Sequence, residues 1–241
     1  MLVFSVTALW CSGQACRALD PQTQVRILPG LFCGLMMGER EVWDTIADSW
    51  TNLRVKPEKE VIKFSKKINS GLILDVGCGN GRNSLPFLEK NLKCVELDFS
   101  RSMIREAKKL LKRRGFNANF VVASVTNLPF KPKVFPTVIF VRTLTHVKTK
   151  GERLEALGEI KGVGKKIIMS CWYKWDKKLF WVVLRHLFSS DVYVDWNYHG
   201  KIYKRFHHLY TKKELKEELK EVGFKNFKMW DDKRGNIWCS T

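Results

Sequence analysis

The sequence predicts an α/β protein built on one doubly wound, mostly parallel sheet of Rossmann-like organisation with an antiparallel hairpin at its C-terminal end. Three observations lead to this prediction. A short apolar run ends in a glycine-rich turn at residues 72–81 and is followed by a helical pattern. Strand and helix patterns then alternate with short connections, which is typical of parallel sheets. The last two strand patterns, 224–230 and 236–240, are joined by a turn.

Each element is predicted from its own periodicity and end signals. The first helix, from Glu58 to Ile68, has apolar residues at helical spacing and a proline beside its first turn. Ser100 and Thr211 are good N-caps, and each of their helices ends at a glycine. The other predicted elements are strands at 72–76, 93–98, 119–123, 137–141 and 166–171 and helices at 83–90, 101–114, 152–160 and 212–222.

Length and charge limit the classes of protein to consider. The chain has 241 residues and a net charge of +19, which fits one domain and a polyanionic partner such as nucleic acid. A lysine-rich solvated surface is the alternative explanation of the charge. No apolar run reaches the roughly 18 residues that a membrane span needs, so we expect no membrane partner. The 7 cysteines form no C-x-x-C pair, so neither a disulfide framework nor a metal site is predicted, and a reducing cytoplasm is the expected location.

Residues 1–36 differ from the rest in having almost no charge and no sustained periodicity. A signal peptide is a poor explanation because the basic N-terminal region is missing. Val25-Arg26-Ile27 is the translation of GTTCGAATC, a sequence typical of a tRNA T-arm. We therefore expect a non-native or disordered extension, a translation start at Met36 or Met37, and a domain over 37–241. An intact mass that includes the extension would contradict this expectation.

The glycine-rich turn has the most specific pattern in the chain. Gly77, Gly79 and Gly81 occupy every second position, which allows a tight backbone and close approach to a ligand. Their amides lie at the start of the next helix and would form a polar cradle. The dinucleotide fingerprint G-x-G-x-x-G requires glycine at position 82, where this chain has Arg82.

An acid at Asp75, two residues before G-x-G-x-G, resembles motif I of the class I S-adenosylmethionine-dependent methyltransferases. The resemblance implies their fold, their activity and S-adenosylmethionine as cofactor. Asp98 follows Gly81 by 17 residues, close to the spacing at which an acid binds ribose hydroxyls, although it could instead cap the next helix. The residues expected to hold the cofactor are Asp75, Gly77, Cys78, Gly79, Gly81, Asp98, Phe99, Met103, Ser124, Val125 and Arg142.

Two positions depart from the pattern of that family. Residues 123–130 resemble its A-D-x-x-x-L-P-F segment, but Ser124 stands where an aspartate contacts the adenine amino group. A hydroxyl accepts that hydrogen bond more weakly than a carboxylate does. Pro136 replaces the usual aspartate of a Phe-Asp pair. These departures predict weaker cofactor binding and leave open a tRNA-binding protein without catalysis.

Other segments resemble the methyltransferases that act on the carboxymethyl group of wobble uridine in tRNA. The late segment 205–210, Arg-Phe-His-His-Leu-Tyr, is the most specific and resembles their R-Y-Y-H-L-Y. The remaining matches are Trp43–Ala47, Arg54–Pro57, Thr145-His146, Asp191–Trp196, Asp231-Asp232 and Asn236–Trp238. The resemblance implies methyl-ester formation on a carboxylate, with tRNA as partner. A class I methyltransferase for a small acid, another RNA or a protein is the alternative.

Esterification needs a positioned carboxylate rather than a base, because the acceptor is already ionised at pH 7. Arginine donors and hydrogen-bonding rings would orient it. The residues expected at this acceptor site are Arg54, His146, Asp195, Arg205, His208 and Tyr210. Alternation along the segment turns His207 and His208 to opposite sides, and the resemblance favours His208. A structural role for His146 is an equal alternative.

The insertion at 172–210 interleaves basic and aromatic residues, which suits a single-stranded anticodon loop. Its apolar run at 179–184 is too short to span a bilayer and is expected in a core helix. The resemblance further implies a small zinc-binding activator subunit.

Overall fold

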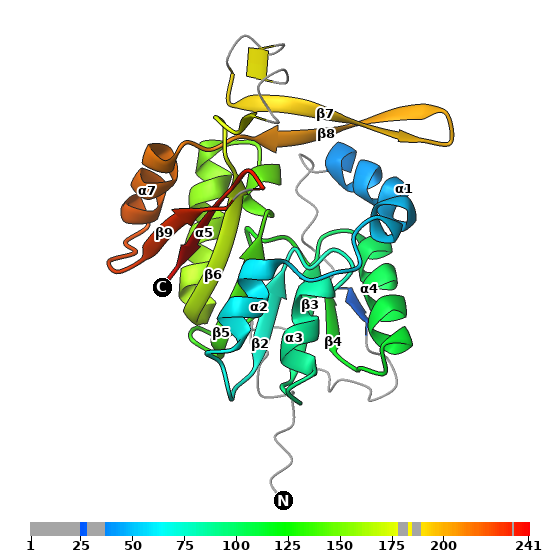
Figure 1. Cartoon of the computed structure of the whole chain (residues 1–241), viewed down its shortest axis with the longest axis vertical. Coiled ribbons are helices and arrows are strands. Elements are labelled where there is room, and N and C mark those ends of the chain that lie inside the picture. The colour runs from blue at the N-terminus through cyan, green and yellow to red at the C-terminus, as the bar shows by residue number, and fades with distance from the viewer. Residues whose placement is uncertain (1–24, 28–36, 178–182, 185–188, 233) are drawn as a thin grey trace, which may run out of the picture.

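A computed structural model describes residues 25–27, 37–177, 183–184, 189–232 and 234–241. Eight strands form one sheet in the order β1-β4-β3-β2-β5-β6-β10-β9 (Figure 1). The strands are β1 (Val25–Ile27), β2 (Ile73–Val76), β3 (Cys94–Asp98), β4 (Asn119–Val122), β5 (Phe135–Val141), β6 (Gly164–Trp172), β9 (Lys228–Asp231) and β10 (Asn236–Ser240). All neighbours are parallel except β10, which is antiparallel to both β6 and β9. The predicted fold class, including its C-terminal hairpin, is confirmed.

Helices cover both faces of the sheet. They are α1 (Met37–Asn52), α2 (Lys59–Ser65), α3 (Leu85–Leu88), α4 (Arg101–Arg113), α5 (Lys150–Val163) and α7 (Lys212–Glu221). Alternate strand residues face opposite sides, so Ile73 packs with α2, α3 and α4, whereas Leu74 packs with α5 and α7. The buried strands therefore consist of nearly continuous apolar runs, as parallel sheets require.

The crevice for a ligand follows from the strand order. β2 pairs with β3 on one side and with β5 on the other, so the chain changes direction at β2. The carboxyl ends of these three strands meet at this switch point, where open α/β sheets bind ligands.

Helix α1 is held over this crevice by the start of α4. Ser100 caps α4 by accepting from the Met103 amide at 3.0 Å. Asp44 of α1 accepts from the Ser100 hydroxyl at 2.6 Å and from the Ser102 amide at 2.9 Å. A carboxylate at a helix N-terminus is favoured by the helix dipole, so this contact fixes α1 against the sheet.

A second, two-stranded sheet was not expected from the sequence. β7 (Asp191–Tyr198) and β8 (Lys201–His208) form an antiparallel hairpin within the basic, aromatic insertion. The hairpin crosses the top of the molecule and reaches α1 (Figure 1). Trp196 donates its indole hydrogen to Ser49 at 3.0 Å, and Tyr198 donates to Asp48 at 2.8 Å. These two bonds join the hairpin to α1 above the crevice.

Three further expectations differ from the structure. The predicted helix at 83–90 is a 3₁₀ turn, η2 (Arg82–Ser84), followed by the four-residue α3. The strand predicted from residue 224 begins at Lys228, because Phe224 packs into the core behind α7. The sequence predicts no element in residues 1–36, whereas Val25–Ile27 form β1, which pairs with β4. The apolar run 179–184 lies mostly outside the described residues, and in the described part no helix has the length and apolarity to cross a membrane.

Candidate active site

The glycine turn after β2 forms the floor of the crevice. Gly77 and Gly79 have positive φ angles of 66° and 56°. A Cβ on Gly77 would lie 2.1 Å from the Thr143 hydroxyl oxygen, and one on Gly79 would lie 3.2 Å from the Trp50 ring. Both glycines, together with Cys78, line a cavity between α1, the sheet edge and β8. Only glycine fits at these two positions.

Asp98 connects this turn to the start of α4. Its Oδ2 accepts from the Gly79 amide and its Oδ1 from the Ser100 amide, both at 2.9 Å. Burial raises the pKa of this carboxyl to about 6, although the two amides oppose the shift. Asp98 lines the cavity beside Phe99 and Met103, as predicted. A carboxylate has about four lone-pair sites, so it can brace the turn and still accept from a ligand.

A smaller pocket continues the cavity toward β4. The two hollows share Gly77, Phe99, Thr143 and His146, and the smaller one ends at Ser124 and Val125. The Ser124 hydroxyl lies 2.8 Å from that of Thr126. The expected cofactor residues Phe99, Ser124 and Val125 therefore share one pocket, and the combined site is elongated along the strand ends.

Two expected cofactor residues lie outside both hollows. Gly81 packs against α4, where a Cβ would lie 3.3 Å from the Ala107 Cβ, so close packing explains this glycine. Asp75 is buried beneath the turn, and burial raises its pKa to about 8. Its Oδ2 has no hydrogen-bond partner among the described residues. Asp75 therefore lies in the core below the turn and lines neither hollow.

On the opposite wall, two guanidinium groups lie against one indole ring. The Arg54 and Arg205 guanidinium carbons are 5.2 and 4.8 Å from the centroid of Trp196. Arg54 also lies 5.1 Å from Trp50, and Arg205 lies 5.8 Å from Trp43. Both arginines line the cavity, and neither forms an ion pair with a carboxylate in the part of the chain that the structure describes. Burial lowers each pKa to about 10, so both remain charged at neutral pH.

Glu58 forms ion pairs with the other two cavity arginines. It pairs with Arg82 at 2.8 Å and with Arg142, and Arg234 lies 3.5 Å away. Arg142 has a positive φ of 58° at the end of β5, a strained conformation that is often found at functional sites. Glu58 carries one negative charge against these three guanidinium groups, so the cavity keeps a net positive charge, to which Arg54 and Arg205 add, and an anionic ligand is favoured.

His146 joins η3 (Leu144–His146) to β8. Its Nδ1 lies 2.9 Å from the Phe206 carbonyl oxygen, which can only accept, so the proton is on Nδ1 and Nε2 holds a lone pair. Burial lowers the pKa to about 4, and the ring is neutral. His146 lines both hollows, which combines the two expectations for it, a structural hydrogen bond and a place at the site.

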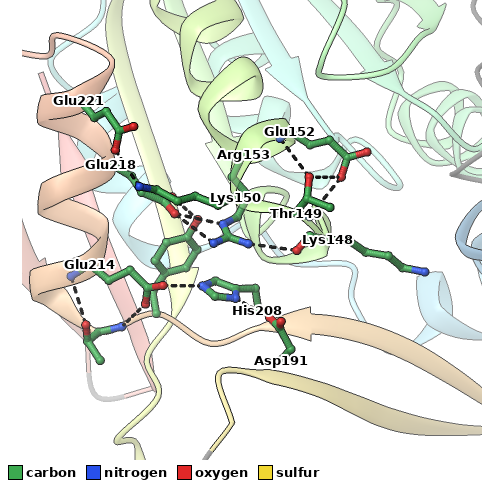
Figure 2. A network of polar contacts seen from close by, with 12 residues as sticks. Lys148, Thr149, Lys150, Glu152, Arg153, Asp191, His208, Glu214, Glu218 and Glu221 are labelled. Carbon is green, nitrogen blue, oxygen red and sulfur yellow. Dashed lines mark hydrogen bonds and ion pairs between the residues drawn. The ribbon is translucent and has the colours of Figure 1, made fainter.

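The choice between the two adjacent histidines is reversed by the structure. His207 lines the cavity, whereas His208 lies between Asp191 at 2.6 Å and Glu214 at 2.9 Å (Figure 2). Residues two positions apart on a strand face the same side, so Arg205 and His207 of β8 face the same side. The cavity side of the strand is thus set by Arg205, and His208 necessarily faces away.

Asp195 and Tyr210 also lie outside the cavity. Asp195 is opposite Lys204 on the outer face of the hairpin and pairs with it at 3.2 Å. Tyr210 is fully buried and donates to Glu218 at 2.7 Å; Glu218 in turn pairs with Arg153. The network around Glu218 and Arg153 joins α7 to α5 (Figure 2). The Tyr210 hydroxyl is therefore occupied by a hydrogen bond inside the core and does not face the cavity.

Comparison with known proteins agrees with this geometry. Residues 73–166 match the family model of a methyltransferase domain. The matched segment runs from β2 to the start of β6, so it includes the glycine turn and Asp98. A methyltransferase of Methanosarcina mazei has the same fold, with a TM-score of 0.60 and 23% identity over 71% of this chain and 91% of that chain.

Two relatives of the methyltransferase domain have more specific names. The human probable tRNA methyltransferase 9B is 28% identical over 162 residues, which are 65% of this chain and 32% of that protein. The Schizosaccharomyces pombe tRNA (carboxymethyluridine(34)-5-O)-methyltransferase is 25% identical over 215 residues, 76% of this chain and 86% of that protein. The chain thus spans about a third of the human relative and most of the yeast one.

The residues of the elongated hollow fit S-adenosylmethionine, which supplies a methyl group on a positively charged sulfur. Gly77 and Gly79 allow the turn to run against Thr143 and Trp50 while its backbone lines the hollow. Asp98 offers a carboxylate for ribose hydroxyls, and the smaller pocket offers apolar walls with the Ser124 hydroxyl for a heterocyclic base. Thr143 donates to the Val76 carbonyl at 3.0 Å and holds the turn to β5.

Sequence reasoning missed several cavity residues. They are Trp50, Arg82, Asn83, Val141, Thr143 and His207, whereas Trp43 and Trp172 were expected only as part of a matched segment and of the aromatic insertion. The indole rings reach the cavity from α1 and from the end of β6, so their placement depends on how distant elements pack. For His207 a signal did exist: it lies two residues after the expected Arg205, on the same side of a strand.

Proposed function

We propose that this methyltransferase domain transfers a methyl group to the carboxylate of 5-carboxymethyluridine at the wobble position of tRNA. The observation that carries the proposal is the pair Arg54 and Arg205, charged, partly buried and without an ion-pair partner among the described residues. Two such groups beside a cofactor hollow suit an anionic acceptor. The names of the human and yeast relatives support tRNA as the substrate class.

The reaction requires orientation more than acid–base chemistry. A carboxylic acid has a pKa of roughly 4, so the acceptor is ionised at neutral pH and one of its oxygens can take the methyl group directly. That oxygen loses its negative charge as the ester forms, and S-adenosylhomocysteine is released. Arg54 and Arg205 would donate hydrogen bonds to the carboxylate lone pairs that do not attack the methyl group. A hydrogen bond to the attacking lone pair would stabilise the ground state and so slow the reaction.

Aromatic rings in the cavity wall support a nucleoside acceptor. Trp43, Trp50, Trp172 and Trp196 lie on or beside the wall that contains the two arginines. Bases of an anticodon loop can leave the stack and lie against such rings. Trp196 is fixed by its bond to Ser49, so the hairpin and α1 would receive the base together.

The test uses total tRNA from a strain that lacks the gene. The full chain, with and without the small zinc-binding subunit that the resemblance implies, is incubated with isotope-labelled S-adenosylmethionine and this tRNA, and nucleosides are identified by mass spectrometry. We expect label on carboxymethyluridine. Label on another nucleoside would replace the proposed substrate. Cofactor binding without any labelled nucleoside would contradict a tRNA substrate and favour a small acid or a protein.

A pair of variants links the reaction to the site. Arg205→Ala removes a guanidinium from the cavity, whereas Lys204→Ala removes the neighbouring charge from the outer face of β8. We expect the first variant to lose turnover while retaining cofactor affinity, and the second to keep both. Equal losses in the two variants would mean that general surface charge, not the cavity arginine, supports activity.

A further inference from the structure

His207 is a buried histidine with no hydrogen-bond partner. It is 1% exposed, and neither ring nitrogen has a partner among the described residues. An imidazole buried in this way loses its hydrogen bonds to water and gains none in return, which is unfavourable. Buried polar groups of this kind are rare and call for an explanation, such as a ligand. His207 lines the cavity, so a bound molecule can reach it.

The ring is held rigidly by two neighbours. Its plane stacks on Trp172 with a centroid distance of 4.2 Å and an interplanar angle of 13°. The His146 ring lies 4.5 Å away on another side. Trp172 ends β6 and His146 follows β5, so two separate strands fix the orientation of the imidazole. Such a clamp is what a positioning group requires.

The charge state follows from the surroundings. Burial is the main cause that lowers the pKa of His207 well below its ordinary value, and His146, Arg205, Arg142 and Arg54 act in the same direction. A neutral imidazole has one N–H donor and one lone pair. It therefore complements a group that offers both an acceptor and a donor, rather than an anion.

His207 and Arg205 share a face of β8, about 6.6–6.8 Å apart along the strand. We propose that His207 is a positioning residue that hydrogen-bonds the imide edge of the acceptor's pyrimidine ring while Arg54 and Arg205 hold its carboxylate. This inference rests on the proposed function. The imide edge of uracil carries a ring N–H between two carbonyl oxygens, so it offers a partner to whichever imidazole nitrogen faces it: its N–H to the lone pair, or a carbonyl oxygen to the imidazole N–H. The family pattern has tyrosine at this position, so histidine here is a feature of this chain.

The experiment uses the full chain and an anticodon stem-loop that carries 5-carboxymethyluridine. His207→Phe keeps a flat ring against Trp172 but removes both nitrogens, and His207→Gln restores a donor and an acceptor. We expect the phenylalanine variant to raise KM for the stem-loop about tenfold with cofactor affinity unchanged, and the glutamine variant to recover part of the loss. An unchanged KM in His207→Phe would overturn the inference.

A second measurement does not depend on variants that fold well. The ring nitrogens of His207 are followed by NMR in the S-adenosylhomocysteine complex as stem-loop is added. We expect their shifts to move with carboxymethyluridine present and to remain still with a stem-loop that lacks the base. If the stem-loop binds and these shifts stay unchanged, the role of His207 is refuted but the proposed function is not. Failure of the unaltered protein to bind or methylate the stem-loop would refute the proposed function, and this inference with it.

Discussion

At the scale of single residues, Asp75 shows how the glycine turn couples to pH. Its carboxyl is buried opposite Glu96 on the adjacent strand, and burial raises the pKa of both groups. The pKa of Asp75 reaches about 8, compared with about 3.9 in an unfolded chain. The folded protein therefore holds more protons than the unfolded one between about pH 4 and 8, and the free energy of unfolding falls as pH rises through that range.

Asp75→Asn removes one of these protonation steps without changing the size of the side chain. We expect the variant to gain stability relative to the unaltered protein at pH 8 and to show little or no gain at pH 4. Urea unfolding at both pH values measures this difference. A gain that is equal at the two pH values would show that Asp75 is ionised in the folded protein.

Several site residues were predictable because backbone geometry alone determines them. Gly77, Gly79 and Asp98 occupy the predicted places, since a glycine turn and an acid at adjacent strand ends must meet. The resemblance selected His208, whereas His207 is the histidine that lines the cavity, because it lies two positions after Arg205 on the same face of β8. The placement of Tyr210 has the same explanation. It lies two residues after His208, on the side away from the cavity, and is buried in the core.

At the scale of elements, the segment before α2 depends on Glu58. This residue is the N-cap of α2, its amide donates to Asn83 at 3.1 Å, and its carboxylate compensates Arg82 and Arg142. It therefore joins α2, the glycine turn and the end of β5. Removing one partner of a buried ion pair leaves a charge uncompensated.

Glu58→Gln keeps the size and one acceptor but removes the charge. We expect a loss of about 3 kcal/mol in the free energy of unfolding, from the low end of the range for broken buried pairs. Glu221→Gln breaks the exposed pair with Lys150 and serves as the matched control, for which we expect almost no change. A small effect in both variants, measured by denaturant unfolding, would mean that solvent already screens the Glu58 charges.

The β7–β8 hairpin shows why the acceptor wall could not be predicted as an element. The outward-facing residues of β7 are exposed, and its other side packs, with β8, on α1 and on Trp172 at the end of β6 without extending the main sheet. The sequence therefore lacks the apolar runs that identified the buried strands. The α1–hairpin contact joins Ser49 to Trp196, and a contact between segments so far apart in the sequence leaves no local pattern.

At the scale of the whole molecule, the charge of +19 suits a polyanionic substrate. The basic side chains of α4 all lie on its exposed face. We expect binding of an anticodon stem-loop to weaken at least about tenfold between 50 and 200 mM salt, because phosphate contacts release counterions. Fluorescence anisotropy across this range measures the slope. Affinity that does not change with salt would show that the basic surface takes no part in binding.

In the proposed reaction, the two walls of one cavity have separate roles. The sheet edge, with the glycine turn and Asp98, would hold the cofactor, and Arg54, Arg205 and the indole rings on the opposite wall would hold the acceptor. The fold and the first wall follow from local sequence patterns. The second wall depends on the packing of segments that are distant in sequence.

The central claim is that the two arginines hold a carboxylate, and one comparison tests it directly. Anticodon stem-loops that carry 5-carboxymethyluridine or its neutral carboxamide differ only in the charge at the acceptor. Their affinities for the full chain are measured with S-adenosylhomocysteine present. We predict that the carboxylate form binds at least about tenfold more tightly and that Arg54→Ala and Arg205→Ala each reduce this difference. Equal affinity for the two stem-loops in the unaltered protein would contradict the account.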